Sequence, residues 1–194
     1  MKSTEEKPRN PWLILFSVAL GLFMVVVDVT ILNIALPTLA DDMGASLAAV
    51  QWTLIGYSLV LAGLVPFFGR ISDVIGRKRL FLTGLLVFGA SSAAAAASPS
   101  VEWLIGARLA QAVGGAIISA NTLAIITDTF PAGKRGIAMG VQSILISGGA
   151  AFGPVIGGVL VTNFTWRAVF LINVPIGLAA ATLGALVLPS LKSH

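Results

Sequence analysis

Long apolar segments alternate with short polar ones along nearly the whole chain. A transmembrane helix needs about 20 mostly apolar residues, and six segments come close enough to this length to qualify. The predicted spans are Leu13–Leu39, Gln51–Phe68, Leu80–Ala97, Val101–Ile126, Ile137–Val161 and Ala168–Leu188. The pattern therefore predicts an all-α membrane domain over residues 13–188, with a polar tail at 1–12 and a short polar end at 189–194.

The composition agrees with a membrane protein. Of the 194 residues, 57% are hydrophobic and 10% are charged, whereas a soluble globular domain carries about 25% charged residues. The chain has no cysteine, and its one histidine, His194, is the last residue. A disulfide framework and a thiol metal site are therefore excluded, and we expect no metal and no cofactor.

The basic residues gather on one side of the predicted spans. Three lie in the N-terminal tail, four in residues 69–79, and the others are Lys134, Arg135 and Lys192. The connections on the opposite side contain only Arg167. Because Lys and Arg are enriched in cytoplasmic loops, this distribution predicts that both termini are cytoplasmic.

Two ionisable residues, Asp28 and Arg108, lie well inside apolar segments. An unpaired charge there costs a few kcal/mol or more. The first span runs outward and the fourth inward, and a rise of about 1.5 Å per residue places the two side chains at depths that differ by only a few ångströms. We expect them to face each other across one cavity, with a purely structural buried ion pair as the alternative.

The fourth span carries a polar stripe with steps of three or four residues, which places its members on one helix face. The stripe consists of Arg108, Gln111, Gly115, Ser119 and Thr122. In the first span, Thr30, Asn33 and Pro37 share a face roughly opposite Asp28. Polar groups at membrane depth are typical of a water or substrate path, so we expect the first span to be central and the third and sixth to be peripheral.

The fifth span carries a ridge of small residues. Gly149, Gly153 and Gly157 recur every four residues, beside Pro154 and Gly158. Such spacing lets another helix backbone approach closely, and a proline inside a helix removes a backbone donor and can kink it. The ridge therefore predicts close helix packing.

Five motifs occur in order on these segments and together resemble the major facilitator superfamily. The run Gly69-x-x-x-Asp73-x-x-Gly76-Arg77-Lys78 is similar to the signature loop between its second and third helices. Leu104-x-x-x-Arg108-x-x-Gln111-x-x-Gly114 is similar to its fourth-helix motif, although Ala112 stands where the family commonly has glycine. The glycine ridge resembles the antiporter motif of the fifth helix.

The other two motifs resemble one branch of that superfamily. Asp28–Pro37 is similar to the first-helix motif of the multidrug branch, and Trp166–Pro175 to the start of its sixth helix. The chain thus looks like the N-terminal six-helix half, made of two three-helix repeats, of a multidrug:proton antiporter from the fourteen-span drug exporter branch.

The resemblance implies proton-coupled efflux of drugs or other small lipophilic or cationic compounds across a bacterial-type cytoplasmic membrane by alternating access. Asp28 would carry the proton and attract the substrate, and Arg108 would control that protonation. The cavity would be lined by Thr30, Asn33, Gln111, Gly115, Ser119 and Thr122. The proton gradient would supply the energy, and the partners would be lipid, a small-molecule substrate and a C-terminal half or second copy, with no nucleic acid.

The resemblance also implies a cytoplasmic gate. Asp73 would hydrogen-bond a helix end of the other half, and Arg77 would pair with Asp128. Gly69 and Gly76 would allow tight turns. The ridge Gly149, Gly153, Pro154, Gly157 and Gly158 would face the other half. Apart from the resemblance, we expect Lys78 and Arg79 in this loop to act only as charges that fix the orientation of the chain in the membrane.

Two other readings stay open beside the transporter. The chain could be a non-transporting or truncated half-transporter, a sensor or fragment, that needs a partner half; left unpaired, its polar stripe and glycine ridge would lie against lipid. A six-span domain of a pump or channel would need a nucleotide-binding P-loop or a filter-like loop, and neither occurs in the sequence. An enzyme is not expected, because there is no His/Cys cluster or nucleophile–base arrangement.

Overall fold

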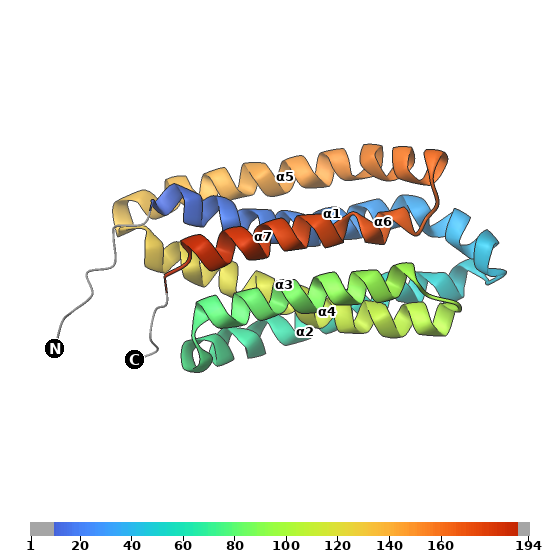
Figure 1. Ribbon diagram of the computed structural model, residues 1–194, viewed down its shortest axis with the longest axis horizontal. Helices are drawn as coiled ribbons and strands as arrows, with labels where there is room; N and C mark the ends of the chain where they lie inside the picture. Colours follow the sequence, from blue (N-terminus) through green and yellow to red (C-terminus); the bar gives the residue numbers. More distant parts are fainter. Residues whose placement is uncertain (1–9, 190–194) are drawn as a thin grey trace.

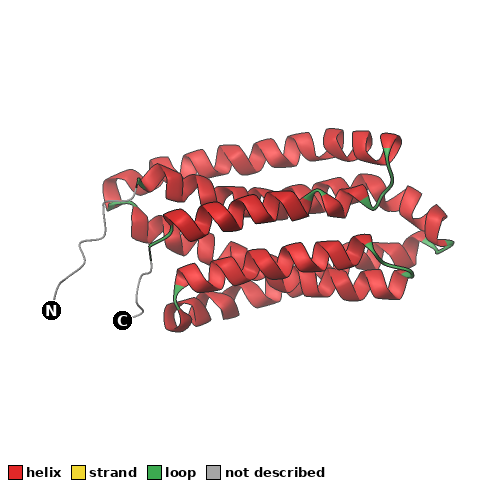
Figure 2. Ribbon diagram, in the orientation of Figure 1, coloured by secondary structure: helices red, strands yellow, loops and turns green. Residues whose placement is uncertain are grey.

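The computed structural model describes residues 10–189, and long helices run side by side through it (Figure 1). The helices are α1 (Pro11–Met43), α2 (Leu47–Ile75), α3 (Arg77–Ala96), α4 (Val101–Thr129), α5 (Ala132–Asn163), α6 (Ala168–Leu171) and α7 (Asn173–Val187). The described residues contain no strand (Figure 2). Six apolar helices, counting 168–187 as one, are long enough to cross a membrane, which confirms the predicted fold class. Most of the two predicted tails, including Lys192, lies outside the described residues.

Side-chain caps begin several of these helices. Asn10 accepts a hydrogen bond from the Trp12 amide at 3.0 Å, Ser46 from Ala49 at 3.2 Å and Ser100 from Trp103 at 3.3 Å. Ser and Asn are favoured in this position because they satisfy amides that have no partner in the first turn. At the other end of α1, Gly44 has a left-handed backbone with φ of 59°, a conformation that glycine adopts without strain.

The helix α2 continues well past the end of its predicted span. It runs through Gly69, Arg70 and Asp73 to Ile75, and the single residue Gly76, with φ of 99°, joins it to α3. The prediction of a tight turn at Gly69 was wrong, because hydropathy reports where the apolar segment ends and not where the helix ends. Gly76 does make the tight turn.

Burial differs strongly between the helices. In the most apolar stretches of α1 and α4, 61% of the residues are buried, against 17% in α5 and 6% in α2. The first span is central, as expected, but the third is well buried and the exposed helices are α2 and α5. The expectation that the third and sixth spans are the peripheral ones was therefore wrong. The number of polar residues in a span therefore did not predict how exposed its helix is.

Small residues allow α3 to lie directly on α4. A Cβ atom added to Gly114 would come 2.6 Å from the backbone nitrogen of Phe88 and 2.9 Å from the carbonyl oxygen of Gly84. These distances are shorter than any ordinary atomic contact, so the two backbones touch here. Ala112, the departure from the family motif, is itself fully buried.

Two apolar clusters fill the interior. One contains Phe81 and Phe88, and the other contains Trp166 and Phe170. Among the buried residues of α1, the change from the first cluster to the second falls between Val25 and Val27. The next residue is Asp28, so the intramembrane carboxylate lies where the two apolar clusters meet.

Candidate functional site

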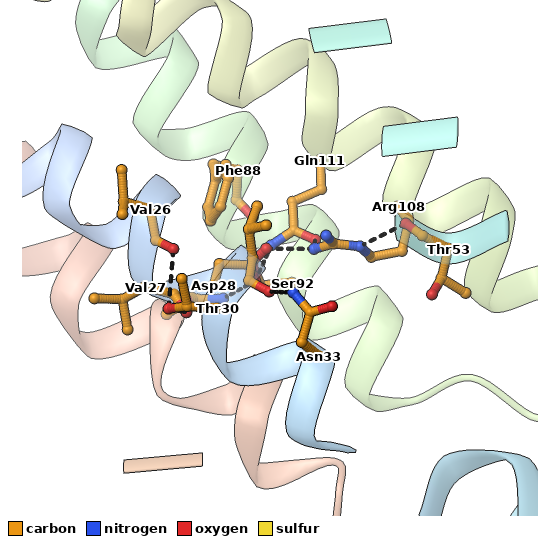
Figure 3. A network of polar contacts seen from close by, with 12 residues as sticks. Val26, Val27, Asp28, Thr30, Asn33, Thr53, Phe88, Ser92, Arg108 and Gln111 are labelled. Atoms are coloured by element: carbon orange, nitrogen blue, oxygen red, sulfur yellow. Dashed lines mark hydrogen bonds and ion pairs between the residues drawn. The ribbon is translucent and has the colours of Figure 1, made fainter. Parts of the chain in front are cut away.

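A buried ion pair joins α1 to α4 (Figure 3). The Oδ2 atom of Asp28 accepts a hydrogen bond from Nη1 of Arg108, and both side chains have no solvent exposure. The two residues that the sequence placed at similar depth are therefore in direct contact, without the intervening cavity that we expected. This contact neutralises two charges that would otherwise be costly at membrane depth.

Two amides complete the ring of donors around the carboxylate. Gln111 donates from Nε2 to Oδ1 of Asp28 at 2.9 Å and to Oγ of Ser92 at 2.7 Å. Asn173 donates from Nδ2 to Oδ1 of Asp28 at 2.6 Å. We call Asp28, Ser92, Arg108, Gln111 and Asn173 the Asp28 cluster. The carboxylate of Asp28 thus accepts hydrogen bonds from three side chains.

The guanidinium group of Arg108 is held from several sides. Its Nε donates to the backbone oxygen of Thr53 at 3.3 Å, and its central carbon lies 4.1 Å from the ring centroid of Tyr57 and 5.7 Å from that of Phe170. Aromatic faces attract cations at such distances. The ion pair and the contacts of Arg108 thus connect α1, α2, α4 and α6.

The polar stripe of α4 lies inside the helix bundle. Arg108, Gln111, Gly115 and Thr122 are buried, and Ser119 is half-buried. A Cβ atom on Gly115 would come 2.9 Å from the hydroxyl oxygen of Tyr57. The expectation that this stripe would lie against lipid in an unpaired half was wrong, because α2 and α3 cover it.

The polar residues of α1 that lie opposite Asp28 are outside the cluster. Thr30 is half-buried and bonds the backbone oxygen of Val27 at 3.0 Å. Asn33 is exposed and donates to the oxygen of Val29 at 2.9 Å. Both side chains donate hydrogen bonds to backbone oxygens of their own helix, as Figure 3 shows for Thr30, and neither contributes to the Asp28 cluster.

The glycine ridge of α5 packs against α1. A Cβ atom would come 2.8 Å from the ring of Phe23 at Gly149, 2.0 Å from Oγ1 of Thr30 at Gly153, and 3.2 Å from the backbone of Ile31 at Gly157. The prediction that these three glycines face lipid or a second half was wrong, because they contact α1. Spacing predicts a smooth surface but does not specify the helix that covers it. Pro154 is exposed, and Gly158 has no neighbour within 4 Å.

We expect Gly153→Ala to destabilise the protein, because the new methyl group overlaps Thr30 and pushes α5 away from α1. Overpacking of this kind costs about 1–3 kcal/mol, measurable as a lower midpoint of thermal unfolding in detergent. The matched control is Gly140→Ala on the same helix, which has no neighbour within 4 Å. Equal midpoints for the two variants would contradict the observed packing.

A second group of charges lies at the junction between α2 and α3. Arg77 forms ion pairs with Asp128 and, at 3.3 Å, with Asp73, and its Nη1 donates to the backbone oxygen of Ala124 at 2.8 Å. The junction is thereby attached to the end of α4. The Asp73 side chain remains 65% exposed.

Lys78 does more than the sequence indicated. Its Nζ donates to the backbone oxygens of Ala185 and Leu188, at 2.8 and 2.7 Å. A cation at a helix C-terminus satisfies carbonyl groups that lack a helical partner. The interpretation of Lys78 as an orienting charge alone was therefore wrong, because it also holds the end of α7 to the start of α3.

Sequence reasoning missed four groups of the site. Asn173, Ser92 and Tyr57 contact the ion pair or its partners, and Thr53 supplies a backbone oxygen. A signal existed for Asn173, since an amide in an otherwise apolar span needs a polar partner. No signal existed for Thr53, because any residue has a backbone carbonyl group.

The fold and the buried ion pair define a multi-pass integral membrane protein with a charged site inside its helix bundle. The sequence model described as "Major Facilitator Superfamily" matches residues 18–193. The chain therefore belongs to this superfamily, whose members are transporters and not enzymes.

Several bacterial proteins resemble the chain over most of its length. It is 46% identical to the methyl viologen resistance protein SmvA of Salmonella typhimurium over 92% of the chain and 36% of that protein. It is 41% identical to the tetracenomycin C resistance and export protein of Streptomyces glaucescens, over 95% of the chain and 34% of that protein. It is 38% identical to the riboflavin transporter RibZ of Clostridioides difficile, over 93% of the chain and 40% of that protein. The chain thus spans less than half the length of these relatives.

A solved structure confirms the fold. A bacterial homologue of the human lysosomal transporter Spinster, in an inward-facing and unoccupied conformation, superposes with a TM-score of 0.81 at 20% identity. The match covers 95% of this chain and 44% of that one. At such identity the likeness extends to the fold alone.

Proposed function

We propose that the chain forms the N-terminal half of an antiporter that exports small lipophilic or cationic compounds across the cytoplasmic membrane by alternating access. The proton gradient supplies the energy, and no cofactor takes part. The names of the relatives support export, since one is a resistance and export protein and another a methyl viologen resistance protein.

The observation that carries this proposal is the fully buried ion pair between Asp28 and Arg108. A proton on Asp28 removes the negative charge and frees Arg108 from its partner. A cationic substrate competes with both the proton and Arg108 for the same carboxylate. Because proton and cation exclude each other at one group, entry of a proton releases the substrate, as antiport requires.

The exposed helices support a second six-helix unit. α2 and α5 present large apolar side chains to the outside of the bundle: Leu59, Phe67, Ile144, Phe152, Val155 and Val159. Transporters of this kind work by rocking two such units around a central site. We propose that a C-terminal half or a second copy covers α2 and α5, with Asn33 and Ser119 close to the path between the units.

The junction at Gly76 fits a gate for this rocking. Arg77 and Asp128 attach it firmly to α4, while the Asp73 carboxylate is mostly exposed. An anion is favourable at a helix N-terminus. Asp73 therefore binds a helix end of the second unit when the cytoplasmic side is closed.

The test is transport by everted membrane vesicles from cells that produce the protein from its natural gene. Methyl viologen serves as the probe, because it is a cationic aromatic compound. We expect an acid-inside gradient to drive its accumulation, and a protonophore to abolish it. If accumulation does not exceed that of vesicles without the protein, the non-transporting half-transporter is the better description.

A further inference from the structure

Asn173 occupies an unusual place in the Asp28 cluster. It is the first residue of α7, directly after the interruption at Ile172 that separates α6 from α7 (Figure 2). Its side chain has no solvent exposure and donates to Oδ1 of Asp28 at 2.6 Å. Its own Oδ1 atom is buried and has no hydrogen-bond partner among the described residues. One half of this amide is therefore used and the other half is free.

The free oxygen matters because Asp28 changes its hydrogen-bonding character when it binds a proton. A carboxylate only accepts hydrogen bonds, whereas a carboxylic acid also donates one. Arg108 has no acceptor atom, and the acceptor atom of Gln111 already receives Nη1 of Arg108 at 2.5 Å. A half-turn of the Asn173 amide would present its free oxygen to the new O–H group.

Among the other groups around Asp28, the Tyr57 hydroxyl is also buried without a hydrogen-bond partner, but within the described residues no hydrogen bond joins it to Asp28, whereas Asn173 already bonds that carboxylate. Arg108 from α4 and Tyr57 from α2 are the charged and titratable side chains near it within residues 10–189. Ser92 from α3 bonds Gln111 and the backbone of Phe88. α5 packs on the other side of α1 through its glycines.

We propose that Asn173 is a positioning residue that keeps Asp28 hydrogen-bonded in both protonation states, donating to the carboxylate and accepting from the carboxylic acid. The inference rests on the proposed function, since it assigns a partner to the proton carried by Asp28. Pro175, two residues further on, lacks the amide that would bond Leu171 four residues earlier. The α6–α7 junction is thus able to adjust as the amide turns.

The experiment follows the infrared band of the protonated carboxyl group of Asp28, assigned as the band that disappears in Asp28→Asn. In Asn173→Leu the carboxylate loses a donor and the carboxylic acid loses an acceptor. Because the hydrogen bond to the charged form is the stronger of the two, we expect the pH at which half of the band is lost to rise, by up to about one unit. The pH profile of methyl viologen transport shifts in the same direction.

Asn121→Leu is the matched control. Asn121 is equally buried, donates to the backbone oxygen of Ile117 at 2.8 Å, and also has an unpartnered Oδ1. The hydrogen bond of the Asn121 side chain within the described residues lies inside α4, so its loss leaves the Asp28 band unchanged. Asn173→Thr keeps a hydroxyl group that both donates and accepts, and we expect it to shift the band less than Asn173→Leu.

An unchanged band in Asn173→Leu, or an equal shift in Asn121→Leu, would overturn the inference. If Asn173→Leu does not fold, the variant Asn173→Thr provides the test. A half-loss pH of the Asp28 band like that of the native protein supports the inference, and a rise of that pH by a full unit overturns it. The infrared band measures the protonation of Asp28 directly and does not depend on transport activity. A shifted band with unaltered proton-driven transport in Asp28→Asn would therefore refute the proposed function and leave the role of Asn173 intact.

Discussion

Proton-driven accumulation of methyl viologen falls to background in the variant Asp28→Asn; this is the largest functional effect that we expect. Asparagine has nearly the same shape as aspartate but neither binds a proton in the working pH range nor carries a charge. The variant can therefore no longer alternate between a proton and a cationic substrate. The measurement is uptake by everted vesicles under an imposed acid-inside gradient, normalised to the amount of protein in the membrane.

Loss of folding must be separated from loss of coupling in this variant. Removing one partner of a buried ion pair costs about 3–5 kcal/mol, because the other charge is left uncompensated. The double variant Asp28→Asn with Arg108→Gln removes both charges, and we expect it to recover thermal stability without recovering proton-driven uptake. Recovery of both would show that the ion pair serves the structure alone.

Asp41→Asn provides the matched control for charge. Asp41 lies on the same helix as Asp28 but is exposed near its C-terminal end. We expect this variant to transport at the native rate. Uptake that persists in Asp28→Asn, or that is equally lost in Asp41→Asn, would exclude Asp28 as the coupling group.

The pairing of Asp28 with Arg108 was predictable from the sequence for a simple reason. Successive spans cross the membrane in opposite directions, and the rise per residue of a helix is constant. Depth therefore follows from sequence position. The closed cluster around the pair was not predictable, because contact also depends on how each helix is rotated about its axis, which depth does not determine.

The glycines of α5 likewise separate what the sequence predicts from what it does not. Their spacing correctly predicted close packing on α5, but the ridge contacts Thr30 and Ile31 of α1 and not a second unit. A surface without side chains carries no information about its partner. The complementary shape lies on the partner helix, which reads in the sequence as an ordinary apolar run.

We expect a substitution at the crossing of α3 and α4 to disturb helix packing strongly. Gly114→Ala would place a methyl group 2.6 Å from the backbone nitrogen of Phe88 and 2.9 Å from the carbonyl oxygen of Gly84. Backbone atoms within a helix cannot move aside as a side chain can, so the two helices must separate. We expect at least the usual overpacking cost of about 1–3 kcal/mol, seen as a marked loss of folded protein in detergent and a lower midpoint of thermal unfolding.

Gly106→Ala on the same helix isolates the steric effect. Gly106 has no neighbour within 4 Å, and alanine favours a helix over glycine by about 1 kcal/mol in water. The control Gly106→Ala should therefore leave the stability of the protein unchanged or raise it slightly, whereas the same substitution at Gly114 lowers it. Separation of α3 from α4 also withdraws Ser92 from Gln111, which bonds Asp28. A Gly114→Ala protein that is as stable as Gly106→Ala would mean that the backbones do not touch at this crossing, and the support of the Asp28 cluster by α3 would have to be abandoned with it.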